Sequence, residues 1–135
     1  MAARTKARKR AVDVLYEAEV RNGDRLAVLG DRVEQGNPPV PEHTVRLVEG
    51  VAEHAARIDA LIDAHTRGWS LDRLPDVDRA ILRMAVFELL WVDDVPDAVV
   101  IDEAVELAKT LSTDESPAYV NGVLGAILAA EVPTA

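Results

Sequence analysis

The sequence of 135 residues contains no cysteine. This absence excludes a disulfide framework and the common thiolate metal sites. No apolar run of about 7 to 15 residues follows the basic N-terminus, so a signal peptide is not expected. No window approaches the roughly 18 to 20 apolar residues that a membrane span requires. We therefore expect a cytoplasmic protein with no membrane segment.

Gly-rich, Ser-rich and repetitive tracts are also missing, and no stretch has a convincing strand pattern. The hydrophobic fraction of 49% is that of a globular chain, and the length suits one domain over residues 1–135. Helical periodicity dominates, which predicts an all-α bundle with short connections. The expected helices are about 3–20, 24–35, 41–65, 76–92, 98–111 and 116–130, with a second bundle over about 70–130. Asn22 and Gly23 are expected to end the first helix, and Ser116 is expected to be the N-cap of the last.

Sequence motifs for catalysis are missing as well. There is no HExxH, Walker loop or GxGxxG, and "NGVLG" has no preceding strand that would make it a phosphate loop. His43, His54 and His65 recur every eleven residues on one expected helix. They would lie about 16 Å apart, too far for one metal ion with ligands at ~2 Å. We expect no enzyme, no catalytic residue, no bound metal and no cofactor.

What the chain does have is a basic start on an acidic protein. The net charge is −9, yet the first ten positions contain no acidic residue and five basic ones, Arg4, Lys6, Arg8, Lys9 and Arg10. These side chains can neutralise phosphates, and the N-terminal end of a helix also favours an anion. The alternative is a tail that only increases solubility. The pattern favours a nucleic-acid surface on the first helix.

The helical positions of the same segment add an aromatic side chain to this surface. The expected buried stripe consists of Ala7, Ala11, Val14, Leu15 and Ala18. It covers about −60° to +40° around the direction of Ala11, whereas Tyr16 lies near 140° and Lys9 near 160°, at about 100° per residue. An exposed ring beside a lysine can stack an unpaired base. The alternative is that Tyr16 packs against a neighbouring helix. Because one short arginine-rich helix lacks the recognition-helix turn of a DNA-reading motif, the pattern favours single-stranded RNA over duplex as the ligand.

The second half of the chain is acidic. Between Asp72 and Glu115 there are 12 acidic residues and four basic ones, Arg73, Arg79, Arg83 and Lys109. Such a surface would repel RNA and attract a basic protein. Ordinary acidic solubility is an equally good explanation from composition alone.

Four segments resemble, in order, the signatures of the bacterial N-utilization substance protein B (NusB) family. They are "ARKRAVDVLYEAEV", "LDRLPDVDRAILRMAVFELL", "DVPDAVVIDEAVELAK" and "STDESPAYVNGVL". The resemblance implies an all-α fold of two small bundles packed as one domain. It also implies transcription antitermination on ribosomal RNA operons, in an antitermination complex with RNA polymerase. In that family the protein pairs with the small-subunit ribosomal protein NusE, and the pair binds boxA RNA.

The resemblance also assigns residues. The family's arginine-rich motif corresponds to Arg4, Lys6, Arg8, Lys9 and Arg10, with Thr5 interrupting the basic run. Its RNA-facing aromatic residues correspond to Tyr16 and Tyr119. Glu115 matches an acidic residue near the RNA and NusE surfaces. Asp78 lies in a segment similar to part of the family's NusE-facing and RNA-facing region, and the resemblance implies that it binds the partner.

Other interpretations stay open at this point. The chain could be a helical protein–protein adaptor without specific RNA binding. The same domain also occurs fused to RNA cytosine methyltransferases, whose catalytic domain is not expected within 135 residues. Some family members form homodimers, and a homodimer through the first helix would cover the basic surface.

Overall fold

The computed structural model describes residues 3–66 and 70–131. Within these two ranges it contains seven α-helices, one short 3-10 helix and no strand, which confirms the all-α prediction. The helices are α1 (Ala3–Val20), α2 (Arg25–Gln35), α3 (Glu42–Glu53), α4 (Ala55–His65), α5 (Asp76–Trp91), α6 (Asp97–Leu111) and α7 (Ser116–Glu131), with the 3-10 helix at Leu71–Arg73.

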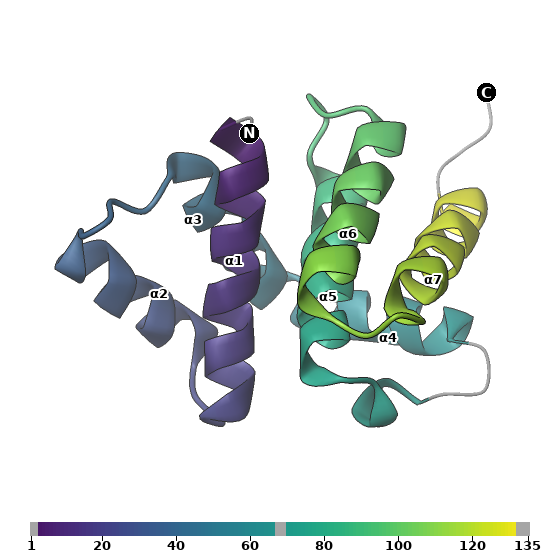
Figure 1. Ribbon diagram of the computed structural model, residues 1–135, viewed down its shortest axis with the longest axis horizontal. Helices are drawn as coiled ribbons and strands as arrows, with labels where there is room; N and C mark the ends of the chain where they lie inside the picture. Colours follow the sequence, from purple (N-terminus) through teal and green to yellow (C-terminus); the bar gives the residue numbers. More distant parts are fainter. Residues whose placement is uncertain (1–2, 67–69, 132–135) are drawn as a thin grey trace.

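The helices form two groups that share α5 (Figure 1). Helices α1, α2 and α3 pack on one another, and α6 and α7 form an antiparallel pair against α5. Helix α4 packs on α5 and α7, while α1 and α3 also contact α5. This arrangement agrees with the two small bundles that the family resemblance implies.

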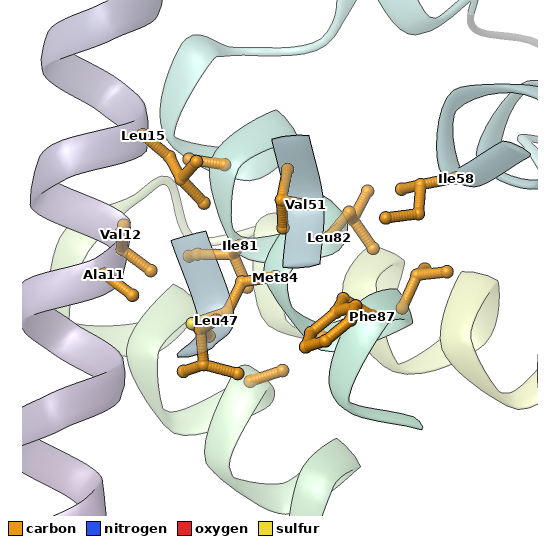
Figure 2. Close-up of a cluster of buried hydrophobic side chains, with 14 of the residues drawn as sticks. Ala11, Val12, Leu15, Leu47, Val51, Ile58, Ile81, Leu82, Met84 and Phe87 are labelled. Atoms are coloured by element: carbon orange, nitrogen blue, oxygen red, sulfur yellow. The ribbon is translucent and has the colours of Figure 1, made fainter. Parts of the chain in front are cut away.

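Helix α5 is central because it is apolar on most sides. Eleven of its sixteen residues are buried, which leaves little of its circumference for solvent. Figure 2 shows Ile81 on the side of Leu15 from α1, and Leu82 next to Ile58 from α4. Full burial of each such side chain stabilises the fold by about 1.5 to 3 kcal/mol. The hydrophobic core therefore runs through both groups of helices.

The C-terminal end of α1 is closed by Asn22 and Gly23, as the sequence predicts. Asn22 has a left-handed backbone with φ of 51°. The Gly23 N–H donates to the carbonyl of Ala18 at 2.8 Å, and the Asn22 N–H donates to that of Glu19 at 3.1 Å. These two bonds form a Schellman motif and satisfy carbonyls that the last turn leaves without partners. The chain then reverses, and α2 packs back on α1.

The expected single helix over 41–65 is wrong, because the structure divides it at His54. The His54 backbone has φ of −106° and ψ of 20°, although its N–H still donates to the Gly50 carbonyl at 3.0 Å. The His54 ring stacks on Trp91, with ring centres 4.2 Å apart. The change of direction lets α3 pack on α1 and α4 pack on α7. The three histidines consequently do not form one stripe along a straight helix.

Candidate nucleic-acid interface

Helix α1 has one buried and one exposed face. The predicted stripe of five residues is buried against α3 and α5, which confirms that part of the helical count. Lys6, Lys9 and Tyr16 lie on the other side and are exposed. Tyr16 is 40% exposed to solvent. The tyrosine therefore points away from the core, as predicted. Exposed ammonium groups and an exposed ring on one helix are suited to phosphates and to a stacked base.

The expectation that Arg8 is available on the surface is wrong. Its side chain is only 3% exposed, and its Nε and Nη2 donate to the two carboxylate oxygens of Glu88 at 2.8 and 2.7 Å. Its Nη1 donates to Glu103 at 2.8 Å. Burial alone would lower the pKa of Arg8, but the hydrogen bonds and negative charges of Glu88 and Glu103 outweigh it and raise the pKa. Arg8 joins α1 to α5 and α6.

The angular position of Arg8 on the helix is a sequence signal for its burial. Arg8 lies about 60° from the direction of Ala11, just outside the apolar stripe. A long side chain at that border can reach the interior, and it is stable there only with carboxylate partners. The carboxylates come from positions far along the chain, so the sequence alone does not identify them.

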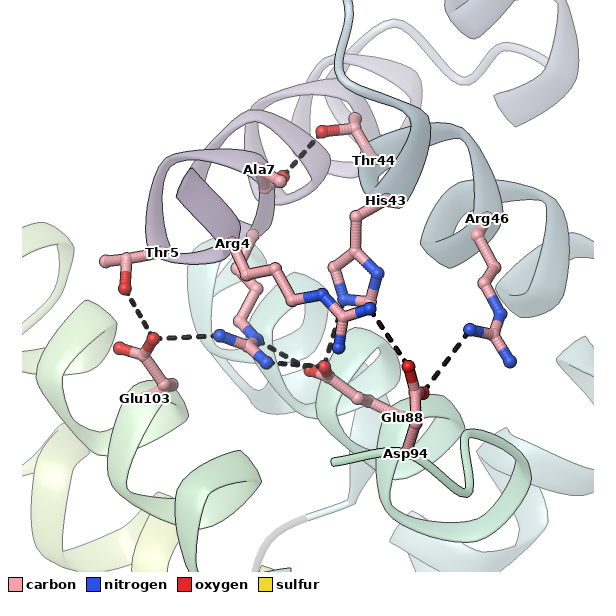
Figure 3. A network of polar contacts seen from close by, with 10 residues as sticks. Arg4, Thr5, Ala7, His43, Thr44, Arg46, Glu88, Asp94 and Glu103 are labelled. Atoms are coloured by element: carbon pink, nitrogen blue, oxygen red, sulfur yellow. Dashed lines mark hydrogen bonds and ion pairs between the residues drawn. The ribbon is translucent and has the colours of Figure 1, made fainter. Parts of the chain in front are cut away.

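Two side chains of α3 make further polar contacts, one with Glu88 and one with the backbone of α1 (Figure 3). The Nε2 of His43 lies 3.1 Å from a Glu88 carboxylate oxygen. Thr44 donates from Oγ1 to the carbonyl of Ala7 at 2.7 Å, which ties α3 to the first turns of α1. Sequence analysis did not identify these contacts, because their partners are separated by tens of residues.

Other residues at the start of α1 also form hydrogen bonds within the protein. Arg4 donates to Asp94 at 3.0 Å, and Arg10 donates to the carbonyl of Pro38 at 3.3 Å. Thr5, which interrupts the basic run, donates to Glu103 at 2.5 Å. The Arg4 hydrogen bond lowers the pKa of the Asp94 carboxyl, with further contributions from the charges of Arg4 and Arg46. Within residues 3–66 and 70–131, Lys6 and Lys9 have no ion pair.

Asp78 is the second residue whose predicted placement is wrong. It was expected to face a partner, but it is 3% exposed, and its carboxylate accepts hydrogen bonds from Ser112 at 2.6 Å and Ser116 at 2.8 Å. A buried carboxylate needs such donors to replace water. The Ser116 hydroxyl, expected to cap its own helix, is used for this contact instead. Asp78 thus holds the turn between α6 and α7 against α5.

That turn carries the other predicted residues. Glu115 is exposed, and Tyr119 is half-buried on the first turns of α7. A surface pocket of about 680 Å³ lies between α5 and this turn, lined in part by Leu74, Pro75 and Tyr119. Burial, with the negative charge of Asp78, raises the pKa of Tyr119.

The structure does not join the two predicted groups in one pocket. In Figure 1, α1 and α7 lie on opposite sides of α5 and α6. Tyr16 is on α1 and Tyr119 is on α7, so one ligand would have to extend across the molecule to contact both.

In the part of the chain that the structure describes, no helix is long and apolar enough to cross a membrane. The same residues contain no group of three or more His, Asp or Glu side chains able to hold a metal ion.

Comparisons with known proteins cover nearly the whole chain. The NusB family model matches residues 5–129. The transcription antitermination protein NusB of Acidothermus cellulolyticus is 60% identical over 129 residues, covering 96% of this chain and 89% of the relative. The protein of the same name from Saccharopolyspora erythraea is 61% identical, covering 94% of this chain and 87% of the relative.

Solved structures give the same result. The structure of T. maritima NusB is similar with a TM-score of 0.87 and 35% identity, covering 98% of this chain and 94% of that one. A crystal structure of the antitermination factors NusB and NusE in complex with dsRNA has a TM-score of 0.83 and 32% identity, covering 94% and 96%. These matches show that the chain belongs to the NusB family.

Proposed function

We propose that this chain is a transcription antitermination factor that binds boxA RNA of ribosomal RNA operons together with NusE. It would act within an antitermination complex with RNA polymerase and support processive transcription of ribosomal RNA. The proposal is supported by relatives named as antitermination proteins and by the solved complex of NusB and NusE with dsRNA. We also propose that the protein acts in the cytoplasm and has no catalytic activity.

The observation that carries the proposal is the exposed face of α1. Lys6 and Lys9 are free to meet phosphates, and each phosphate contact on a single strand contributes about 0.7 to the slope of log affinity against log salt. The exposed ring of Tyr16 offers a stacking surface for one base, a contact worth about 1 to 3 kcal/mol. The opposite face of the helix is packed, so the exposed side chains have a fixed direction.

Arg8 then has an indirect role in the same surface. Its buried pairing with Glu88 and Glu103 fixes the position and rotation of α1 relative to α5 and α6. A helix held in this way presents Lys6 and Lys9 in one arrangement, which lowers the entropy lost on binding RNA. We therefore propose Arg8 as a residue that positions the RNA surface rather than one that contacts RNA.

NusE would meet the acidic half of the molecule. Two of the basic residues in that half are already occupied, since Arg83 pairs with Asp59 and Arg79 pairs with Glu19. Glu115 stays exposed on the turn between α6 and α7. We propose that Glu115 faces NusE or RNA, with Tyr119 beside it, and that Asp78 acts by holding this turn.

A titration with labelled RNA tests the proposal. The RNAs are a boxA single strand, a scrambled strand of the same length and a boxA duplex, each with and without NusE and at several salt concentrations. The duplex is included because the solved complex contains dsRNA. We expect preference for the boxA single strand, strengthened by NusE and weakened steeply by salt. Equal weak binding to all three RNAs in both conditions would indicate a protein adaptor without specific RNA binding.

A further inference from the structure

The connection between α5 and α6 places Asp94 between two arginines from other helices (Figure 3). The Nη2 of Arg4 from α1 lies 3.0 Å from Asp94 Oδ2. The Nη1 of Arg46 from α3 lies 3.6 Å from Asp94 Oδ1. Each carboxylate oxygen is thus approached by one guanidinium. The three side chains come from three separate elements and meet at the N-terminal end of α1.

Arg46 reaches this position although its own helix offers nearer partners. Glu42 lies four residues before it and Glu49 three residues after it, and both spacings permit an ion pair on a helix surface. Among the described residues, Arg46 forms its ion pair with Asp94 and with neither glutamate. The guanidinium is therefore directed away from its own helix and toward Arg4.

We propose that Arg4 and Arg46 form a phosphate subsite for RNA, and that the carboxylate of Asp94 occupies this subsite in the RNA-free protein. The inference rests on the proposed function of α1. Two non-bridging phosphate oxygens can take the places of the two carboxylate oxygens, since guanidinium groups bind both anions in the same planar manner. The RNA surface would then include Arg46 from α3 in addition to the basic run of α1.

The surroundings of the pair leave space for a nucleotide. A hollow of about 570 Å³ lies beside it, lined by Arg4, His43, Val45 and Arg46 together with Glu42 and Glu49. The two glutamates would repel further phosphates, so the hollow suits one phosphate held by both arginines. At about 100° per residue Arg4 lies about 160° around α1 from Lys6, so RNA that contacts both would pass around the N-terminal end of the helix.

The contacts of Asp94 are weak enough to be replaced. The side chains of Arg4, Arg46 and Asp94 are exposed by 44, 48 and 57%. Ion pairs with this exposure contribute little because water and salt screen them. Once Lys6 and Lys9 hold one phosphate of an RNA strand, another phosphate of the same strand competes with Asp94 at a high effective concentration. Displacement of Asp94 then requires only a movement of its side chain and loop.

Four single substitutions test this subsite by RNA titration at several salt concentrations, using the full chain and the boxA single strand. Arg46→Ala is compared with Arg57→Ala, which removes an exposed arginine that pairs with Glu131 elsewhere. Asp94→Asn is compared with Asp93→Asn, its exposed neighbour. Each control changes the net charge as its partner does. Circular dichroism establishes that all four variants keep the helical content of the parent.

We expect Arg46→Ala to lower affinity about two- to fivefold and the salt slope by about 0.7, and Asp94→Asn to raise affinity about two- to fivefold. The two controls should change affinity less. Equal effects of each variant and its control, with normal RNA binding by the parent, would refute the subsite and leave the proposed function intact. No RNA binding by the parent protein would refute the proposed function and the subsite with it.

Discussion

Arg8 and Glu88, eighty residues apart in the chain, form a buried ion pair through two parallel hydrogen bonds of 2.8 and 2.7 Å. The two side chains are 3% and 1% exposed. A third contact comes from His43, whose Nε2 lies 3.1 Å from Glu88. Because the fork of the guanidinium matches the carboxylate, this pair fixes the distance and the rotation between α1 and α5.

Removal of Arg8 should destabilise the fold strongly. Arg8→Ala leaves the Glu88 carboxylate buried without its charged partner, which costs about 3 to 5 kcal/mol. The free energy of unfolding, measured by urea titration, checks this value. Arg10→Ala is the matched control and should cost less than about 1 kcal/mol, because Arg10 is half-buried with one backbone contact. Equal losses in the two variants would show that the buried pair does not hold α1.

Tyr16 should affect binding more than stability. Because its ring is exposed, Tyr16→Ala should weaken RNA binding by about 1 to 3 kcal/mol and change the free energy of unfolding by about 0.5 kcal/mol or less. Binding curves and thermal melts on the same samples separate the two effects. Tyr16→Phe keeps the ring and should bind like the parent protein. Loss of stability without loss of binding would contradict a stacking role.

Gly50 should tolerate no larger residue. A Cβ atom at this position would overlap the ring of Phe87, which lies directly against the α3 backbone. Gly50→Ala should therefore destabilise the protein by about 1 to 3 kcal/mol through overpacking. Gly30→Ala is the control, since Gly30 lies within α2 with open space around its Cβ position. It should stabilise by about 0.5 to 1 kcal/mol. Similar values for both variants in urea unfolding would contradict the close approach.

Tyr119 should lose its proton at higher pH than a free tyrosine. Burial and the charge of Asp78 raise its pKa above the ordinary value of 10.0. The folded state then keeps a proton that the unfolded chain loses, so this contribution to stability is complete below pH 10.0 and falls as the pH rises through the folded pKa. In the Tyr16→Phe variant, ultraviolet absorbance of phenolate reports Tyr119 alone, because the chain has two tyrosines.

Asp78→Asn provides the comparison for that titration. Removal of the negative charge should lower the pKa of Tyr119 relative to the Tyr16→Phe background. Circular dichroism across the same pH range shows whether the helices persist. A Tyr119 titration at the ordinary value, in a chain that is still folded, would contradict its placement against Asp78.

Local sequence signals predicted most of the fold. The helical period placed α1 at the observed residues and identified its buried stripe. Asn22 and Gly23 marked its end because few other residues adopt the left-handed backbone that the cap requires. The outward direction of Tyr16 follows from the same count of about 100° per residue.

Other features depend on contacts between distant residues, which local patterns do not contain. The division at His54 has no proline or adjacent glycine to mark it. It lets α3 pack on α1 and α4 pack on α7, while both contact α5. Arg8 and Asp78 carry charge, so their sequence positions indicated surface roles. Their burial depends on Glu88 and on Ser112 and Ser116, which are 80, 34 and 38 residues away.

The most direct test of the central claim is the salt dependence of boxA affinity for a Lys6→Ala and Lys9→Ala double variant. These lysines are exposed on α1, so the fold should be unchanged. If they neutralise two phosphates, affinity should fall and the slope of log affinity against log salt should decrease by about 1.4, twice the value for one contact on a single strand. A parent-like affinity and slope in the folded double variant would show that RNA does not bind this face of α1.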